Sequence, residues 1–295
     1  MSFPSKLVHT LVGHEGSVLC VKFNYNGKYC LSCGQDRSVR LWNPHTGKLI
    51  KTYLGHGYEI VDLVVTNDNK NFITCGGDKD AYFWDVTHGK VLRKYRGHDH
   101  KINTLAINKE SNVFFSGSID RTVKIWDLRS RSTASIQTLD DFKDSVTSIY
   151  VSSSEIICGS VDGYLRTYDI RNGKLVSDFV DESITSISLS NDENCVLVSC
   201  LDNKLRMFNK DTGELLNEYS GHSNQNYKLS SCFANNDSFV VSGSEDNLIY
   251  IWDLVDAKVV NKLEGHKGFV CGLDYNSDKS CLLSSSIDGT ICVWK

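Results

Sequence analysis

The chain has 295 residues, of which 40% are hydrophobic and 23% are charged, and its formal net charge is −4 at pH 7. This composition is ordinary for a globular protein, and no apolar run approaches the roughly 18 residues that predict a membrane-spanning helix. The isoelectric point, about 6.1, argues against a general nucleic-acid binder, which needs a basic face to neutralise phosphates.

The N-terminal segment already shows the pattern that recurs along the chain. The start, MSFPSKLVHTL, lacks the basic and apolar regions of a signal peptide. Instead, SKLVHTLVGH at residues 5–14 matches GKLIKTYLGH at 47–56 and AKVVNKLEGH at 257–266. The segment is therefore expected to be a strand of an internal repeat.

A repeat with a spacing of mostly 42 residues runs to the C-terminus. An aspartate follows a strand of small residues in every copy, at Asp36, Asp78, Asp120, Asp162, Asp202, Asp246 and Asp288. Six residues later stands an aromatic residue, at Trp42, Trp84, Trp126, Tyr168, Phe208, Trp252 and Trp294. A Gly-His pair precedes five of the aspartates, ending in His14, His56, His98, His222 and His266.

Short runs of alternating apolar and polar residues fill each copy, as in SVLCVKF and SVRLW. Asn-Gly, Asp-Gly, His-Gly and Thr-Gly turns separate them. Such runs predict about four short antiparallel strands per repeat, and nothing has sustained helical periodicity. No linker or low-complexity tract interrupts the pattern, so residues 1–295 are expected to form one all-β domain.

Repeats of this length with these marks resemble the WD-repeat family of β-propellers. The resemblance implies seven four-stranded blades in a ring around a central channel. The chain ends at Lys295, one residue past the third strand of the seventh repeat. We therefore expect residues Leu7 to Leu11 to pair beside the strand that ends at Trp294, which closes the ring and removes an open sheet edge.

In the family, histidine, serine or threonine, aspartate and tryptophan form a buried hydrogen-bonded tetrad. Carried onto this sequence, the tetrads are His14, Ser32, Asp36, Trp42; His56, Thr74, Asp78, Trp84; His98, Ser116, Asp120, Trp126; His222, Ser242, Asp246, Trp252; and His266, Ser284, Asp288, Trp294. Serine, histidine and aspartate together suggest a hydrolase. However, the set occurs five times, and the indole N–H occupies the hydroxyl, so a structural role is expected and the chain is not expected to be an enzyme.

The cysteines do not form a metal-binding pattern. There are 11, and the one C-x-x-C pair is Cys30 and Cys33. Residues three apart in a strand point to opposite faces, so this pair cannot share a zinc ion. We expect no metal and no cofactor, and reduced thiols in the cytoplasm and nucleus.

The fourth and fifth repeats depart from the pattern. The histidine is replaced by Phe142 and Val180, and the serine by Cys158 and Val198. Either these blades have drifted neutrally, or they form a softer region that a partner exploits.

The family resemblance implies that partners bind loops on the top face of the ring. The residues just before the first strands are Ser17, Glu59, Lys101, Ser145, Ser183, Tyr227 and Phe269, and those before the turn aspartates are Gln35, Gly77, Ile119, Val161, Leu201, Glu245 and Ile287. The sixth repeat has two extra residues around SNQNYK, which shift its register relative to the other repeats.

A protein-binding surface is predicted from the large apolar and charged members of these two sets, with Tyr58 nearby. Its residues are Tyr58, Glu59, Lys101, Ile119, Val161, Leu201, Tyr227, Glu245, Phe269 and Ile287. The alternative is that these side chains plug the channel or cover one another.

Five stretches resemble more specifically the mitogen-activated protein kinase organiser family: residues 28–47, 53–62, 116–131, 159–180 and 209–229. This resemblance implies a scaffold for kinase-cascade components and a component of the pre-mRNA splicing machinery. The expected partners are other proteins, with no direct nucleic acid and no membrane, and the chain is expected to be monomeric by itself.

Two other binding functions are compatible with the sequence. Residues 126–129, Trp-Asp-Leu-Arg, match the W-D-x-R box of cullin-RING ubiquitin ligase substrate receptors, and 168–171, Tyr-Asp-Ile-Arg, nearly match it. Arg40, Lys124, Arg166 and Arg206 occupy one equivalent strand position and would form an RNA-binding arc, but these side chains are expected to pair with acidic neighbours.

Overall fold

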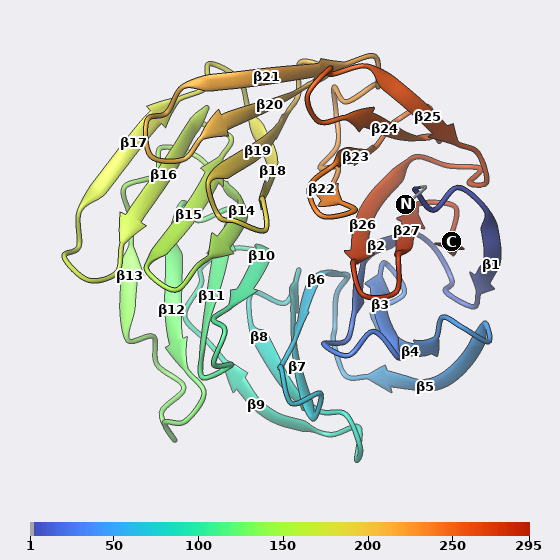
Figure 1. Cartoon of the computed structure of the whole chain (residues 1–295). Helices are drawn as coiled ribbons and strands as arrows, with labels where there is room; N and C mark the ends of the chain where they lie inside the picture. The colour runs from blue at the N-terminus through green and yellow to red at the C-terminus, as the bar shows by residue number, and fades with distance from the viewer. Residues whose placement is uncertain (1–2) are drawn as a thin grey trace.

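The computed structural model describes residues 3–295, which form strands and turns and contain no helix. The strands make seven four-stranded antiparallel sheets arranged as blades around a central axis (Figure 1). No segment of the described chain is a long apolar helix of the kind that crosses a membrane.

The strands are numbered here in chain order, and each blade is given from the axis outward. Blade 1 is β2 (Val18–Phe23), β3 (Cys30–Gly34), β4 (Ser38–Asn43) and β5 (Lys48–Leu54); blade 2 is β6 (Ile60–Val65), β7 (Asn71–Gly76), β8 (Ala81–Asp85) and β9 (Val91–Tyr95). Blade 3 is β10 (Ile102–Ile107), β11 (Val113–Ser118), β12 (Val123–Asp127) and β13 (Gln137–Leu139); blade 4 is β14 (Val146–Val151), β15 (Glu155–Ser160), β16 (Tyr164–Asp169) and β17 (Leu175–Phe179).

The remaining blades follow the same order. Blade 5 is β18 (Ile184–Leu189), β19 (Cys195–Cys200), β20 (Lys204–Asn209) and β21 (Leu215–Ser220); blade 6 is β22 (Ser231–Ala234), β23 (Phe239–Gly243), β24 (Ile249–Asp253) and β25 (Val259–Leu263). Blade 7 is β26 (Val270–Asn276), β27 (Cys281–Ser286), β28 (Thr290–Trp294) and the N-terminal β1 (Leu7–Val12).

The ring closes through blade 7, as predicted. Strand β1 pairs antiparallel with β28, with Leu7 opposite Trp294 and Leu11 opposite Ile291. Figure 1 shows the N-terminal strand at the outer edge of this blade. Because Leu11 is buried, the closing strand contributes core contacts as well as backbone hydrogen bonds.

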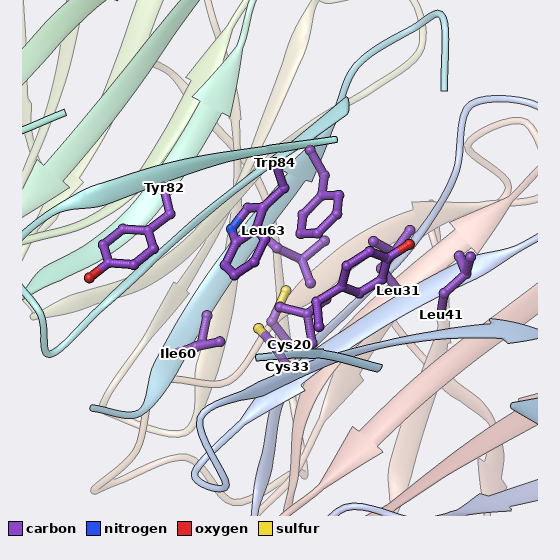
Figure 2. Packing of buried hydrophobic residues seen from close by; sticks show 11 residues of the cluster. Cys20, Leu31, Cys33, Leu41, Ile60, Leu63, Tyr82 and Trp84 are labelled. Carbon is purple, nitrogen blue, oxygen red and sulfur yellow. The ribbon is translucent and has the colours of Figure 1, made fainter. Parts of the chain in front are cut away.

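The core lies between adjacent blades, since each sheet packs face to face against the next. Figure 2 shows the layer between blades 1 and 2, where Cys20, Leu31 and Cys33 meet Leu63 and Trp84. Cys30 belongs to the layer on the other side of blade 1, which confirms that the C-x-x-C residues face opposite ways. Burial raises the pKa of the Cys281 thiol to about 11, so this side chain stays protonated at neutral pH.

Side chains of the innermost strands join the blades around the channel. The Asp62 carboxylate accepts the backbone N–H of Leu105 at 2.8 Å, and the Asp274 carboxylate accepts the N–H of Phe23 at 2.7 Å. Between blades 4 and 5, the Ser148 hydroxyl accepts the N–H of Ile187 at 3.0 Å. These bonds fix the inner strands of neighbouring blades to one another and so support the loops that the strands carry.

Candidate protein-binding face

The hydrogen-bonded tetrad is present in blades 1, 2, 3 and 7. In blade 1, His14 Nδ1 lies 2.8 Å from Asp36 Oδ2, and His14 Nε2 lies 2.7 Å from Ser32 Oγ. The Trp42 indole N–H donates to Ser32 Oγ at 2.9 Å. The hydroxyl is therefore fully engaged and is not a free nucleophile. The same three links join His56, Thr74, Asp78, Trp84; His98, Ser116, Asp120, Trp126; and His266, Ser284, Asp288, Trp294.

The tetrad aspartates of blades 1, 3 and 7 also hold two loops of the top face through backbone N–H groups. The Asp36 carboxylate accepts the backbone N–H of Ser38 at 3.1 Å and that of Glu15 at 3.2 Å. Burial alone would raise the pKa of Asp36, but the hydrogen bond from His14 lowers it well below its ordinary value. The carboxylate is therefore ionised at neutral pH, and it holds the turn that carries Gln35 against the loop that carries Ser17.

Blade 6 lacks the tetrad, so the prediction for His222, Ser242, Asp246 and Trp252 is wrong. The Trp252 indole donates to the carbonyl of Ser220 at 2.9 Å, and the Ser242 hydroxyl donates to the carbonyl of Gly243 at 2.9 Å. Both ring nitrogens of His222 are buried without a partner among residues 3–295. The two extra residues between His222 and Ser242 change the approach of this loop, and Asp246 accepts from Tyr250 instead, at 2.7 Å.

In blades 4 and 5 the turn aspartate forms an ion pair with an arginine instead of a hydrogen bond with histidine. Arg166 pairs with Asp162 at 2.9 Å, and its guanidinium lies 5.0 Å from the centre of the Phe142 ring, which stands where other blades have histidine. Arg206 pairs with Asp202 in the same way. Together with Arg40, which pairs with Asp36 at 3.4 Å, these side chains are engaged with acidic neighbours as expected. Lys124 differs, because it donates to the Thr138 hydroxyl at 3.2 Å.

The top-face candidates surround one end of a channel cavity of about 890 Å³. Glu59, Lys101, Tyr227, Phe269 and Ile287 line this cavity. The Tyr227 and Phe269 rings stack with centroids 4.1 Å apart, and Lys101 pairs with Glu59 at 2.9 Å. Five candidates lie outside the lining of the cavity: Tyr58, Ile119, Val161, Leu201 and Glu245.

Exposure separates the candidates further. Tyr58, Tyr227 and Ile119 are exposed, by 61%, 49% and 43%. Val161, Leu201, Phe269 and Ile287 are half-buried. The candidates therefore differ in accessibility: Tyr58, Tyr227 and Ile119 are accessible to solvent, whereas the other four are partly covered by their neighbours.

The blade 6 insertion crosses the mouth of the channel, which the sequence alone did not reveal. The Glu245 carboxylate accepts the backbone N–H groups of Gln225, Asn226 and Tyr227 at 2.9, 2.7 and 3.2 Å. Lys228 Nζ reaches the carbonyl of Asn103 in blade 3 at 2.9 Å. Glu245 is therefore a loop anchor, and Lys228 is a further residue of the face, for which the two-residue insertion was the only signal in the sequence.

The arginines of the W-D-x-R box and its near match lie at the opposite end of the ring, on loops between third and fourth strands. Arg129 pairs with Asp127 through Nε at 3.1 Å and Nη2 at 3.1 Å. Arg171 is exposed, and its backbone N–H donates to Asp169 at 2.7 Å. These residues are thus remote from the top face.

Known proteins match this chain over nearly its whole length. The family model "Nucleolar protein 10-like, N-terminal domain" matches residues 34–257, and "WD domain, G-beta repeat" matches 5–43 and 257–295. WD repeat domain-containing protein 83 from Homo sapiens is 48% identical over 292 residues, which is 99% of this chain and 92% of that protein. The Xenopus laevis protein of that name is 47% identical over 292 residues, 99% of this chain and 93% of its own length.

Proposed function

Because this chain belongs to the WD-repeat family of β-propellers, we propose that it is a non-catalytic scaffold that binds other proteins through the top face. Propellers of this family generally mediate protein–protein interactions. The observation that carries the proposal is the exposed Tyr227 ring, stacked on Phe269 at the channel mouth.

Aromatic side chains on a rigid support favour binding. Tyr227 is held by its stacked neighbour and by the backbone bond from its N–H to Glu245, so it loses little side-chain freedom when a partner arrives. Tyrosine is also enriched among the residues that dominate binding energy at interfaces. Tyr58 and Ile119 extend the exposed apolar surface over blades 2 and 3.

The partners proposed are components of a mitogen-activated protein kinase cascade or of the pre-mRNA splicing machinery. The five stretches that resemble the kinase organiser family support this choice. The engagement of the tetrad hydroxyls by histidine and tryptophan also fits a role in assembly. With such partners the protein would act in the cytoplasm and the nucleus.

The test is affinity purification of the tagged chain from nuclease-treated extract, followed by mass spectrometry. The top-face variant carries Tyr227→Asp and Ile119→Asp. The matched control carries Tyr25→Asp and Val255→Asp, which change more exposed apolar residues, 68% and 80%, on loops at the other end of the ring.

Capture of splicing or kinase-cascade proteins by the parent and the control, but not by the top-face variant, is the expected result. Equal capture by all three proteins would show that partners use another face. If only ligase adaptors are captured, the W-D-x-R box gives the better account.

A further inference from the structure

The connection between the third and fourth strands of blade 3 differs from its counterparts. It spans residues 128–136, whereas the equivalent connections are 44–47, 86–90, 170–174, 210–214 and 254–258. Strand β13 is correspondingly short and pairs with β12 only from Ile125 to Val123. In blade 2, by contrast, the outer strand reaches Trp84. An irregular loop thus replaces the first half of this outer strand.

The base of the loop is fixed, and its tip is free. Arg93 Nη1 donates to the carbonyl of Leu128 at 3.0 Å and to that of Ser130. Residues 131–134 are all exposed. Their hydrogen bonds are local, from the Ser132 N–H to Ser130 Oγ at 3.0 Å and from the Ala134 N–H to Ser132 Oγ at 3.2 Å. The tip can therefore be extended without breaking any pairing of the sheet.

The sequence of the tip is basic and rich in hydroxyl groups. Residues 129–135 are Arg-Ser-Arg-Ser-Thr-Ala-Ser, and no carboxylate occurs between Asp127 and Asp140. Ser132 follows Arg129 by three positions and Arg131 by one. A kinase with an acidic peptide groove selects substrates by this charge pattern. Thr133 and Ser135 have serines at the third position before them, so they fit such a groove less well.

We propose that Ser132 is a phosphorylation site for an arginine-directed serine/threonine kinase. In the reaction, Ser132 Oγ attacks the γ-phosphorus of ATP, and the bond from that phosphorus to the β–γ bridging oxygen breaks. ADP leaves, and the hydroxyl proton passes to the base of the kinase. The loop supplies what this chemistry requires of a substrate: an exposed hydroxyl on a segment that can adopt an extended conformation.

The modification would change the electrostatics of the end of the ring opposite the top face. A phosphate carries a charge of about −1.5 to −2 at neutral pH and binds guanidinium groups strongly. Arg129 is exposed and paired with Asp127, so the phosphate on Ser132 would compete with Asp127 for it. The His98 tetrad lies at the other end of blade 3 and would remain intact. The effect is therefore local to the face that carries the W-D-x-R box.

The experiment incubates the folded, full-length chain with the catalytic subunit of cAMP-dependent protein kinase, magnesium and ATP. Intact-mass measurement counts the phosphates, and peptide fragmentation locates them. Parallel samples carry Ser132→Ala, Arg129→Ala or Thr133→Ala, and thermal melting checks that each variant is folded. A further sample replaces the kinase with one that prefers acidic substrates.

One phosphate on Ser132 in most chains is expected, with nearly complete loss in Ser132→Ala, a large loss in Arg129→Ala and little change in Thr133→Ala. Three results would overturn the proposal. They are negligible phosphorylation of the folded parent, incorporation that survives Ser132→Ala, and equal modification by the acid-preferring kinase.

Discussion

Blades 1, 2, 3 and 7 differ from blades 4, 5 and 6 in how they stabilise the same fold. The first group uses a buried chain of hydrogen bonds from tryptophan through serine or threonine and histidine to aspartate. The second group keeps the aspartate but binds it to Arg166, Arg206 or Tyr250. The comparison teaches that the turn aspartate is kept in all seven blades, whereas the rest of the network is replaceable.

The largest effect is expected from removing the central aromatic residue in each group. Trp126 is fully buried and stacks on Phe114 with centroids 5.8 Å apart, whereas Phe208 in blade 5 is half-buried. Trp126→Ala should destabilise the protein by about 3–5 kcal/mol, since it leaves a cavity and removes the donor to Ser116. Phe208→Ala should cost clearly less. Urea unfolding measures both, and equal losses would contradict the distinction between the two groups.

A sharper test deletes one hydroxyl from each group. Ser116 Oγ lies between His98 and Trp126, so Ser116→Ala leaves two buried groups unpaired and should cost about 2–4 kcal/mol. Ser242 in blade 6 is equally buried, but its hydroxyl bonds only the carbonyl of Gly243. Ser242→Ala should therefore cost less than about 1 kcal/mol. Chemical denaturation measures the free energy of unfolding of both variants. A loss for Ser242→Ala as large as that for Ser116→Ala would show that blade 6 contains a tetrad after all.

The buried, unpaired His222 of blade 6 predicts that the stability of the protein depends on pH. Burial lowers the pKa of His222 to about 4, so the folded state resists protonation while the unfolded state accepts a proton near pH 6.5. Stability from this group is complete above pH 6.5 and is lost as the pH falls toward 4. His222→Phe should thus gain about 2 kcal/mol relative to the parent at pH 5, compared with pH 7.5.

His98→Phe is the matched control for this experiment. It removes the partner of Asp120 and Ser116, so it should destabilise the protein at both pH 5 and pH 7.5. Thermal melting at the two pH values measures both variants. If the difference between His222→Phe and the parent is independent of pH, His222 has a hydrogen-bonding partner in solution and the comparison between the groups weakens.

The sequence predicted the features that recur in every repeat, but it did not predict the features that depend on the conformation of a single loop. The seven copies and the closure by β1 follow from spacing, because each copy confirms the register of the others, and the family resemblance then implies the strand order and four of the tetrads. The prediction of a tetrad in blade 6 was wrong because two inserted residues redirect a loop, although all four residues of the motif are present. The bond from Lys228 to Asn103 joins residues 125 apart in the chain, and no local pattern encodes such a contact.

The smallest expected effect concerns the residue after each turn aspartate. Arg37, Lys79 and Arg121 have φ angles of 61°, 64° and 65°, a region that costs an ordinary L-residue about 1 kcal/mol. Blades 4 and 7 place Gly163 and Gly289 there, and blades 5 and 6 place Asn203 and Asn247, which tolerate this conformation. Replacing the three basic residues with asparagine should therefore stabilise the protein by a few tenths of a kcal/mol at each position.

Gly163→Arg is the reverse experiment, and it isolates the backbone contribution. A Cβ at Gly163 would make an ordinary contact, 3.4 Å from the Phe179 ring, so the expected loss of about 1 kcal/mol comes from the positive φ and not from a clash. The melting temperature of the parent, the triple asparagine variant and Gly163→Arg should fall in the order triple variant, parent, Gly163→Arg. If the triple variant is less stable than the parent, the three basic side chains contribute stabilising interactions that outweigh their strain, and blades 1 to 3 differ from the others in their turns as well as in their tetrads.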